Sequence, residues 1–166
     1  MTPPPEKKTS PTVHVAHLAD DEDVAASFAV LSASFGHDAP FVDAYYPLHD
    51  TAAGRAQGAA RLAAWRLASA AKSAFLKAVL VPGGGGADGN DGGGGEGERR
   101  EKIVGFAIWT LMREPPSPDL RDAEPHPEAV WPDPSDREFV RRLWREYVVP
   151  RSRAVEAAGG KGVYGE

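Results

Sequence analysis

A chain of 166 residues can form one domain, although its proline-rich start and a glycine-rich stretch contribute little to a core. Its formal net charge of -5 argues against nucleic-acid binding, which needs a clustered basic surface. Cysteine is absent, which excludes disulfides and thiol nucleophiles and fits a cytoplasmic protein, and no apolar run approaches the ~18 residues of a membrane span.

The first folded element is expected after a short tail. Residues 1–11 offer almost no apolar surface to offset the entropy of ordering, so we expect them to be disordered. From Thr12 to Leu18, Val13 and Val15 alternate with other residues, which predicts a half-buried strand. The folded part is therefore expected to span residues 12–166.

A helix is predicted immediately after this strand. Asp20 is a suitable N-cap, and Val24, Phe28 and Leu31 recur at helical spacing before Gly36 ends the pattern. Acidic residues fill the first turn, where they complement the helix dipole.

A second helix follows a turn-rich stretch from His37 to Asp50. The segment from Thr51 to Lys72 is dominated by Ala, Arg and Leu, with Leu62 and Trp65 on one face. We expect this segment to be helical.

Two apolar runs are predicted to pair as antiparallel strands, Ser73 to Val81 and Lys102 to Met112. Residues 82–101 between them contain glycine tracts without the Gly-Lys-Ser/Thr ending of a phosphate loop. This composition favours a flexible hairpin insertion over a phosphate site.

A third helix is predicted after a proline-rich segment. Residues 113–134 contain too many prolines for regular structure, since each proline removes a backbone donor. Ser135 and Glu138 have the spacing of a capping box, and Pro150 is expected to kink the helix that they open. Gly159 and its neighbour Gly160 should end it, before a strand that begins at Val163.

Several of these segments resemble a known enzyme superfamily. KIVGFAIWTL at Lys102 to Leu111 looks like the third strand of fungal GNAT N-acetyltransferases. FLKAV at Phe75 to Val79 and FVRRLWREYVVPRSRAV at Phe139 to Val155 are similar to the same group. The order of elements also agrees. The chain therefore resembles the amino-terminal half of a GNAT (acyl-CoA N-acyltransferase) domain, which implies an incomplete α+β fold: an antiparallel sheet with flanking helices.

The resemblance implies transfer of an acetyl group from acetyl-CoA to the amine of a small molecule or peptide. Family members continue beyond a segment like Lys161 to Tyr164 into a central strand and an Arg/Gln-x-x-Gly-x-Gly/Ala loop, whose N–H groups hold the cofactor pyrophosphate. This chain ends at Glu166, so we expect that loop to be absent and assign no catalytic residue. The alternative is a non-catalytic fragment or a small binding module.

Candidate substrate-groove residues lie between the first two predicted helices. Phe41, Asp43, Tyr45 and Tyr46 occupy the loop that lines the acceptor groove in the resembling family. Ordinary packing of aromatic side chains beneath a loop is the alternative. Trp109 on the third strand is a further groove candidate, with a place in the core as its alternative.

Neither the histidines nor the arginine cluster indicates another kind of site. The five histidines lack the spacing of a metal site. Opposite charges at helical spacing, such as Glu138 with Arg142, make a solvated helix face a sufficient reason for the cluster. The clustered arginines are Arg137, Arg141, Arg142, Arg145, Arg151 and Arg153.

Overall fold

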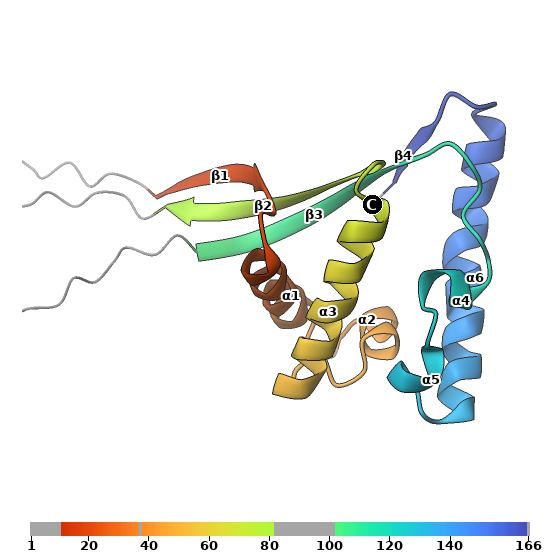
Figure 1. Cartoon of the computed structure of the whole chain (residues 1–166), viewed down its shortest axis with the longest axis horizontal. Coiled ribbons are helices and arrows are strands. Elements are labelled where there is room, and N and C mark those ends of the chain that lie inside the picture. The colour runs from red at the N-terminus through yellow and green to blue at the C-terminus, as the bar shows by residue number, and fades with distance from the viewer. Residues whose placement is uncertain (1–10, 37, 82–101, 166) are drawn as a thin grey trace, which may run out of the picture.

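A computed structural model describes residues 11–36, 38–81 and 102–165 (Figure 1). The predicted tail, apart from its last residue, and the glycine-rich insertion therefore lie outside the described residues. In chain order the elements are β1 (Thr12–His17), α1 (Asp21–Phe35), α2 (Pro40–Tyr45), α3 (Ala52–Ser69), β2 (Ser73–Val81), β3 (Lys102–Met112), α4 (Leu120–Ala123), α5 (Pro127–Val130), α6 (Pro134–Ala157) and β4 (Val163–Gly165).

The strands form a four-stranded antiparallel sheet in the order β1-β2-β3-β4. Both strands of the predicted hairpin have the predicted bounds. Helices α1 and α3 pack beneath the sheet, whereas α2, α4 and α5 gather beside the long helix α6 (Figure 1). The molecule is thus an α+β fold, as predicted.

The first predicted helix is confirmed at both ends. The Asp20 carboxylate accepts a hydrogen bond from the Asp23 N–H at 2.9 Å and so caps α1. Gly36 follows the helix with φ of 52°, a left-handed conformation that favours glycine.

The main core lies between the sheet and helices α1 and α3. Phe28 of α1 is fully buried and packs with Leu62 of α3 and Phe75 of β2. Gly58 of α3 lies directly against the Phe28 ring, where a Cβ atom would collide with it. The absence of a side chain at this position therefore lets the two helices approach closely.

Short helices correct two predictions of irregular structure. α2 forms within the predicted turn-rich stretch, and α4 and α5 form within the proline-rich segment. Pro40 and Pro127 each stand in a first helical turn, where a missing N–H costs no hydrogen bond. Asp119 caps α4 by accepting from the Arg121 N–H.

The start of α6 differs from the predicted capping box. Asp133 is the N-cap, and its carboxylate accepts hydrogen bonds from the hydroxyl and the N–H of Ser135 at 2.6 and 2.7 Å. These bonds lower the pKa of the Asp133 carboxyl. The helix continues past Pro150 and ends before Gly159, which has a positive φ, as does Gly160.

The face of the sheet opposite α1 and α3 is apolar and exposed. The strand register places Val13 and Val15 on this face, with Ala107 and Trp109 of β3. Val15 is 69% exposed and Trp109 43%, so β1 is not the half-buried strand that its alternation predicts, and Trp109 is not a core residue. The described helices pack against the other face, which explains both differences (Figure 1).

Candidate functional site: an aromatic cluster

The aromatic residues predicted to line a substrate groove gather around α2. Phe41 and Tyr45 are four residues apart on this helix, and their rings stack with centroids 5.6 Å apart. Tyr46, at the end of α2, meets Tyr45 edge to face at 5.0 Å and Phe28 of the core at 5.0 Å. Three of the predicted residues are therefore in direct contact.

Three further rings, which the sequence did not assign to this site, complete the cluster. Trp144 and Tyr147 of α6 stack on Tyr45 and Phe41 at 6.0 and 5.2 Å, and Trp131 lies 5.9 Å from Tyr45. The aromatic cluster is defined here as Phe41, Tyr45, Tyr46, Trp131, Trp144 and Tyr147. The aromatic cluster joins α2 to α6, and its rings contact one another across this junction.

Positive charge reaches the cluster from Arg151, 3.5 Å from the Tyr147 ring centroid, and from Arg61 of α3. The Arg61 guanidinium carbon lies 4.6 to 5.0 Å from the ring centroids of Tyr45, Tyr46 and Trp131. Its Nε donates to Glu124 Oε2 at 2.6 Å, and its Nη1 donates to the carbonyl of Tyr45 at 2.7 Å. The guanidinium is thus occupied by protein groups and is not free to bind an anion.

The two tyrosine hydroxyls near Arg61 remain protonated at neutral pH. Burial raises the pKa of Tyr45, and the positive charge of Arg61 offsets only part of that effect. Burial also raises the pKa of Tyr46, strongly, and the neighbouring Tyr45 adds to the rise. Neither hydroxyl can therefore act as a tyrosinate base near neutral pH.

Asp43, the fourth predicted residue near α2, belongs to a polar network with His49 and Ser32. Its Oδ1 lies 3.0 Å from His49 Nε2, while Ser32 Oγ lies 2.9 Å from His49 Nδ1 and 2.8 Å from the His49 carbonyl oxygen. A serine, histidine and aspartate in series are typical of nucleophilic catalysis, but Ser32 is only 7% exposed and His49 only 1%. A substrate cannot reach this serine, so the network instead ties α1 to the segment between α2 and α3.

Trp109 is separate from the other predicted site residues. Its neighbours Phe106 and Ile108 pack towards α1 and α3, whereas Trp109 lies on the uncovered face of the sheet. The structure therefore brings together Phe41, Asp43, Tyr45 and Tyr46 around α2 and leaves Trp109 outside this group.

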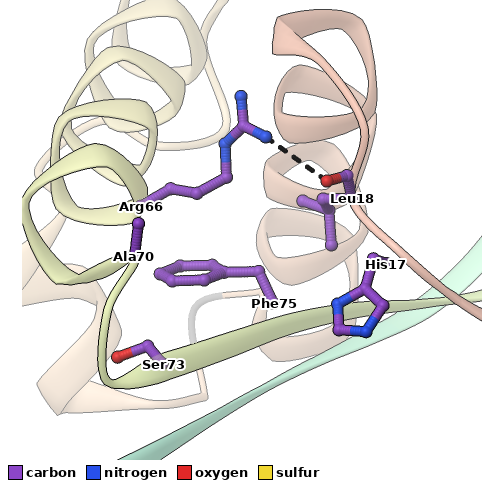
Figure 2. Close-up of a pocket in the computed structure, with 6 residues that line it drawn as sticks. All are labelled: His17, Leu18, Arg66, Ala70, Ser73 and Phe75. Atoms are coloured by element: carbon purple, nitrogen blue, oxygen red, sulfur yellow. Dashed lines mark hydrogen bonds between the residues drawn. The ribbon is translucent and has the colours of Figure 1, made fainter.

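A small cavity lies between β2, the end of β1 and α3 (Figure 2). It has a volume of about 130 Å³, below the ~300 Å³ of a small ligand site. Arg66 lines it and donates to the carbonyls of Leu18 and Ala19 at 3.3 and 3.2 Å. The other lining residues shown are His17, Ala70, Ser73 and Phe75.

A larger groove of about 870 Å³ runs between α1 and the hairpin strands. Its lining combines small apolar residues of α1 with charged residues of α1, β2 and β3, and Lys77 forms an ion pair in it with Asp23 at 2.6 Å. Burial alone would raise the pKa of Asp23, but Lys77 and the N–H of Ala19 outweigh that effect and lower the pKa. Lys77 is therefore engaged in the fold.

The family's Arg/Gln-x-x-Gly-x-Gly/Ala pattern also occurs at residues 55–60, but not as a loop. Arg55, Gly58 and Ala60 have the spacing of the family pattern, but they lie inside α3, where the backbone N–H groups serve the helix. Gly58 is also buried against Phe28. The residues of this pattern thus do not fit the cofactor.

Within residues 11–36, 38–81 and 102–165, no group of acidic and histidine side chains could hold a metal ion. Over the same ranges, no helix is both long and apolar enough to cross a bilayer.

No known protein family matches this chain, and neither a curated protein nor a solved structure is similar to it. The resemblance to N-acetyltransferases therefore rests on the sequence motifs and on the order of elements.

Proposed function

We propose that this chain is a GNAT-type N-acetyltransferase polypeptide corresponding to the amino-terminal part of that domain. The observation that carries the proposal is the pairing of the KIVGFAIWTL segment in β3 with the FLKAV segment in β2. Two long helices, α1 and α3, connect β1 to β2, in the order that the family resemblance implies. Helical structure at β3 would have contradicted the proposal.

The acceptor in this proposal is the amine of a small molecule or peptide, held near α2. Phe41 is a partly exposed ring on this helix, and aromatic rings attract cationic amines. The Tyr147 ring already faces the Arg151 guanidinium, 3.5 Å from its centroid. Asp43, also partly exposed, adds a negative charge close by. Acetyl-CoA would supply the acetyl group, but the described residues provide no pyrophosphate loop for it.

A second candidate function is a non-catalytic binding module. It is favoured by the position of Arg55, Gly58 and Ala60 inside a helix, because tight CoA binding needs free N–H donors. We accordingly expect the isolated chain to turn over no acetyl-CoA, whatever its family.

Calorimetric titration with acetyl-CoA tests the cofactor side of the proposal. A circular dichroism melt first establishes that the chain folds cooperatively, and acetyl-pantetheine, which lacks the pyrophosphate, is the control ligand. Micromolar binding of acetyl-CoA alone would support a surviving cofactor site. Absence of binding by a folded chain would support the non-catalytic alternative.

The acceptor side has its own test, in which Phe41→Ala is compared with Phe139→Ala. Phe139 is half exposed on α6 and serves as a matched control outside the aromatic cluster. An amine that binds at α2 should lose affinity several-fold with the first variant and not with the second. Equal affinity of both variants would remove α2 from the acceptor site.

A further inference from the structure

The network of Ser32, His49 and Asp43 is buried at its serine end and reaches solvent at its aspartate end. Ser32 is only 7% exposed. The side chain of His49 is 1% exposed, whereas that of Asp43 is 33% exposed. A bound molecule can therefore touch the Asp43 carboxylate, while the serine and the histidine lie behind it.

The chemistry of the carboxylate fixes the direction of the hydrogen bonds. An ionised carboxylate only accepts, so the proton between Asp43 Oδ1 and His49 Nε2, 3.0 Å apart, belongs to the ring nitrogen. Ser32 Oγ lies 2.9 Å from Nδ1, across the ring, and 2.8 Å from the His49 carbonyl oxygen. Ser32 therefore fixes the orientation of the ring, and the ring directs its Nε2–H at Asp43.

The three members of the network stand on different parts of the fold. Ser32 belongs to α1, which is anchored in the main core by Phe28. Asp43 belongs to α2, a helix of six residues, and His49 follows it in the segment before α3. A helix this short has little stability of its own. The core therefore determines, through Ser32 and His49, where the Asp43 carboxylate lies.

We propose that His49 and Ser32 are positioning residues that hold the Asp43 carboxylate for the amine of the acceptor, and that this fixed charge selects a protonated primary amine over a neutral molecule of the same shape. The inference rests on the proposed function, because it takes the acceptor to be held near α2. A carboxylate that is already oriented binds a cation more tightly, since it loses less freedom on binding.

This role reverses the order found in serine hydrolases. There the serine meets the substrate and the aspartate is the buried support of the histidine. Here the aspartate meets the ligand and the serine is the buried support. The three side chains act in binding, so neither Ser32 nor His49 exchanges a covalent bond with the acceptor.

Two probes of similar shape separate charge selection from a general loss of structure. 2-Phenylethylamine is a cation at neutral pH, and 2-phenylethanol is neutral. We expect the natural chain to bind the amine about tenfold more tightly than the alcohol, as an NMR titration measures. A purely structural role of the network would weaken the binding of both probes alike and leave their ratio unchanged.

His49→Leu removes the N–H that holds Asp43 and should lower the ratio of the two affinities by at least about threefold, the effect of one hydrogen bond. His49→Gln, whose side-chain amide can donate to Asp43, should restore most of the ratio. His14→Leu is the matched control, because His14 is an exposed histidine of β1 outside the network. Circular dichroism shows whether each variant folds, and Ser32→Ala replaces His49→Leu if that variant does not.

The outcomes distinguish this inference from the proposed function. A natural chain that binds neither probe, or both equally, removes the acceptor site at α2 and the inference with it. A natural chain that prefers the amine, with the same ratio in His49→Leu and Ser32→Ala, keeps the acceptor site and overturns the positioning role alone.

Discussion

Arg61 is the residue on which the electrostatics of the aromatic cluster depends. The side chains of Arg61 and Glu124 are only 12% and 13% exposed, so their ion pair is poorly screened by water. The same guanidinium faces three rings. Removing it leaves the Glu124 carboxylate buried without this partner.

We expect Arg61→Met to lower the free energy of unfolding by about 3–5 kcal/mol, as does the loss of one partner of a buried ion pair. Urea unfolding measures this change. Arg141→Ala is the control, because the Arg141–Glu138 pair is half exposed and should contribute less than about 1 kcal/mol. Similar losses for the two variants would contradict the role assigned to Arg61.

The carboxyl of Asp23 should make stability depend on pH in the acid range. Its pKa is lowered in the folded state from the ordinary 3.8, chiefly by Lys77, so its contribution is present above about pH 4 and is lost as the pH falls through the folded value. Asp23→Asn should therefore be less stable than the natural chain at pH 6, with the difference shrinking at pH 3.

Unfolding of both chains at the two pH values checks this dependence on Asp23. Asp21→Asn is the matched control from the same helical turn, since Asp21 is 88% exposed. A stability difference for Asp23→Asn that stays constant with pH would exclude its carboxyl as the titrating group.

Sequence reasoning found about half of the candidate site at the residue scale. Phe41 and Tyr45 are neighbours on one helix, and short sequence distance makes their contact foreseeable. Arg61 and Glu124 are far apart in sequence, and only tertiary packing brings them together. Trp144 and Tyr147 lie three residues apart on α6, but nothing local indicates which rings they meet.

The close packing of α3 against α1 depends on the absence of a side chain at Gly58. In a helix interior, replacing Gly with Ala usually stabilises by up to about 1 kcal/mol. At Gly58 the new methyl group would meet the Phe28 ring, so the helix preference is opposed by overpacking.

We expect Gly58→Ala to lower the free energy of unfolding by about 1–3 kcal/mol, the usual effect of overpacking. Thermal melts measure the effect, and the double variant Gly58→Ala with Phe28→Leu should recover part of it. A single variant more stable than the natural chain would show that α3 can move away from α1.

Elements with a long periodic pattern were predicted well, and short ones were not. α1 agrees with its prediction because its helical spacing repeats over many residues, and β2 and β3 agree because each is a long apolar run rich in β-branched or aromatic residues. α4 and α5 have only four residues each, too few for a periodic pattern, and prolines surround them. Their formation follows from packing against α6.

The whole molecule has an apolar face that its described helices do not cover. Val15 on this face is exposed, whereas Val24 of α1 is fully buried. A sheet usually buries one apolar face against another layer. In this molecule both faces of the sheet are apolar, but the described helices cover only one of them. The alternation of residues along a single strand does not show which face is covered.

We expect Val15→Thr to change the free energy of unfolding by less than about 0.5 kcal/mol while reducing the binding of a hydrophobic dye. The matched variant Val24→Thr should lower stability by about 1–3 kcal/mol, since it buries a hydroxyl. Dye fluorescence and urea unfolding give the two readouts. Strong destabilisation by Val15→Thr would show that this face is covered in solution.

The attachment of β4 has a consequence for how the molecule opens. Met112 pairs with Val163 only after about fifty intervening residues, so closing this loop costs entropy that a tight turn avoids. Among the described strands, three residue pairs between β3 and β4 offset that entropy. β4 should therefore be the last of the described strands to join the sheet and the first to detach.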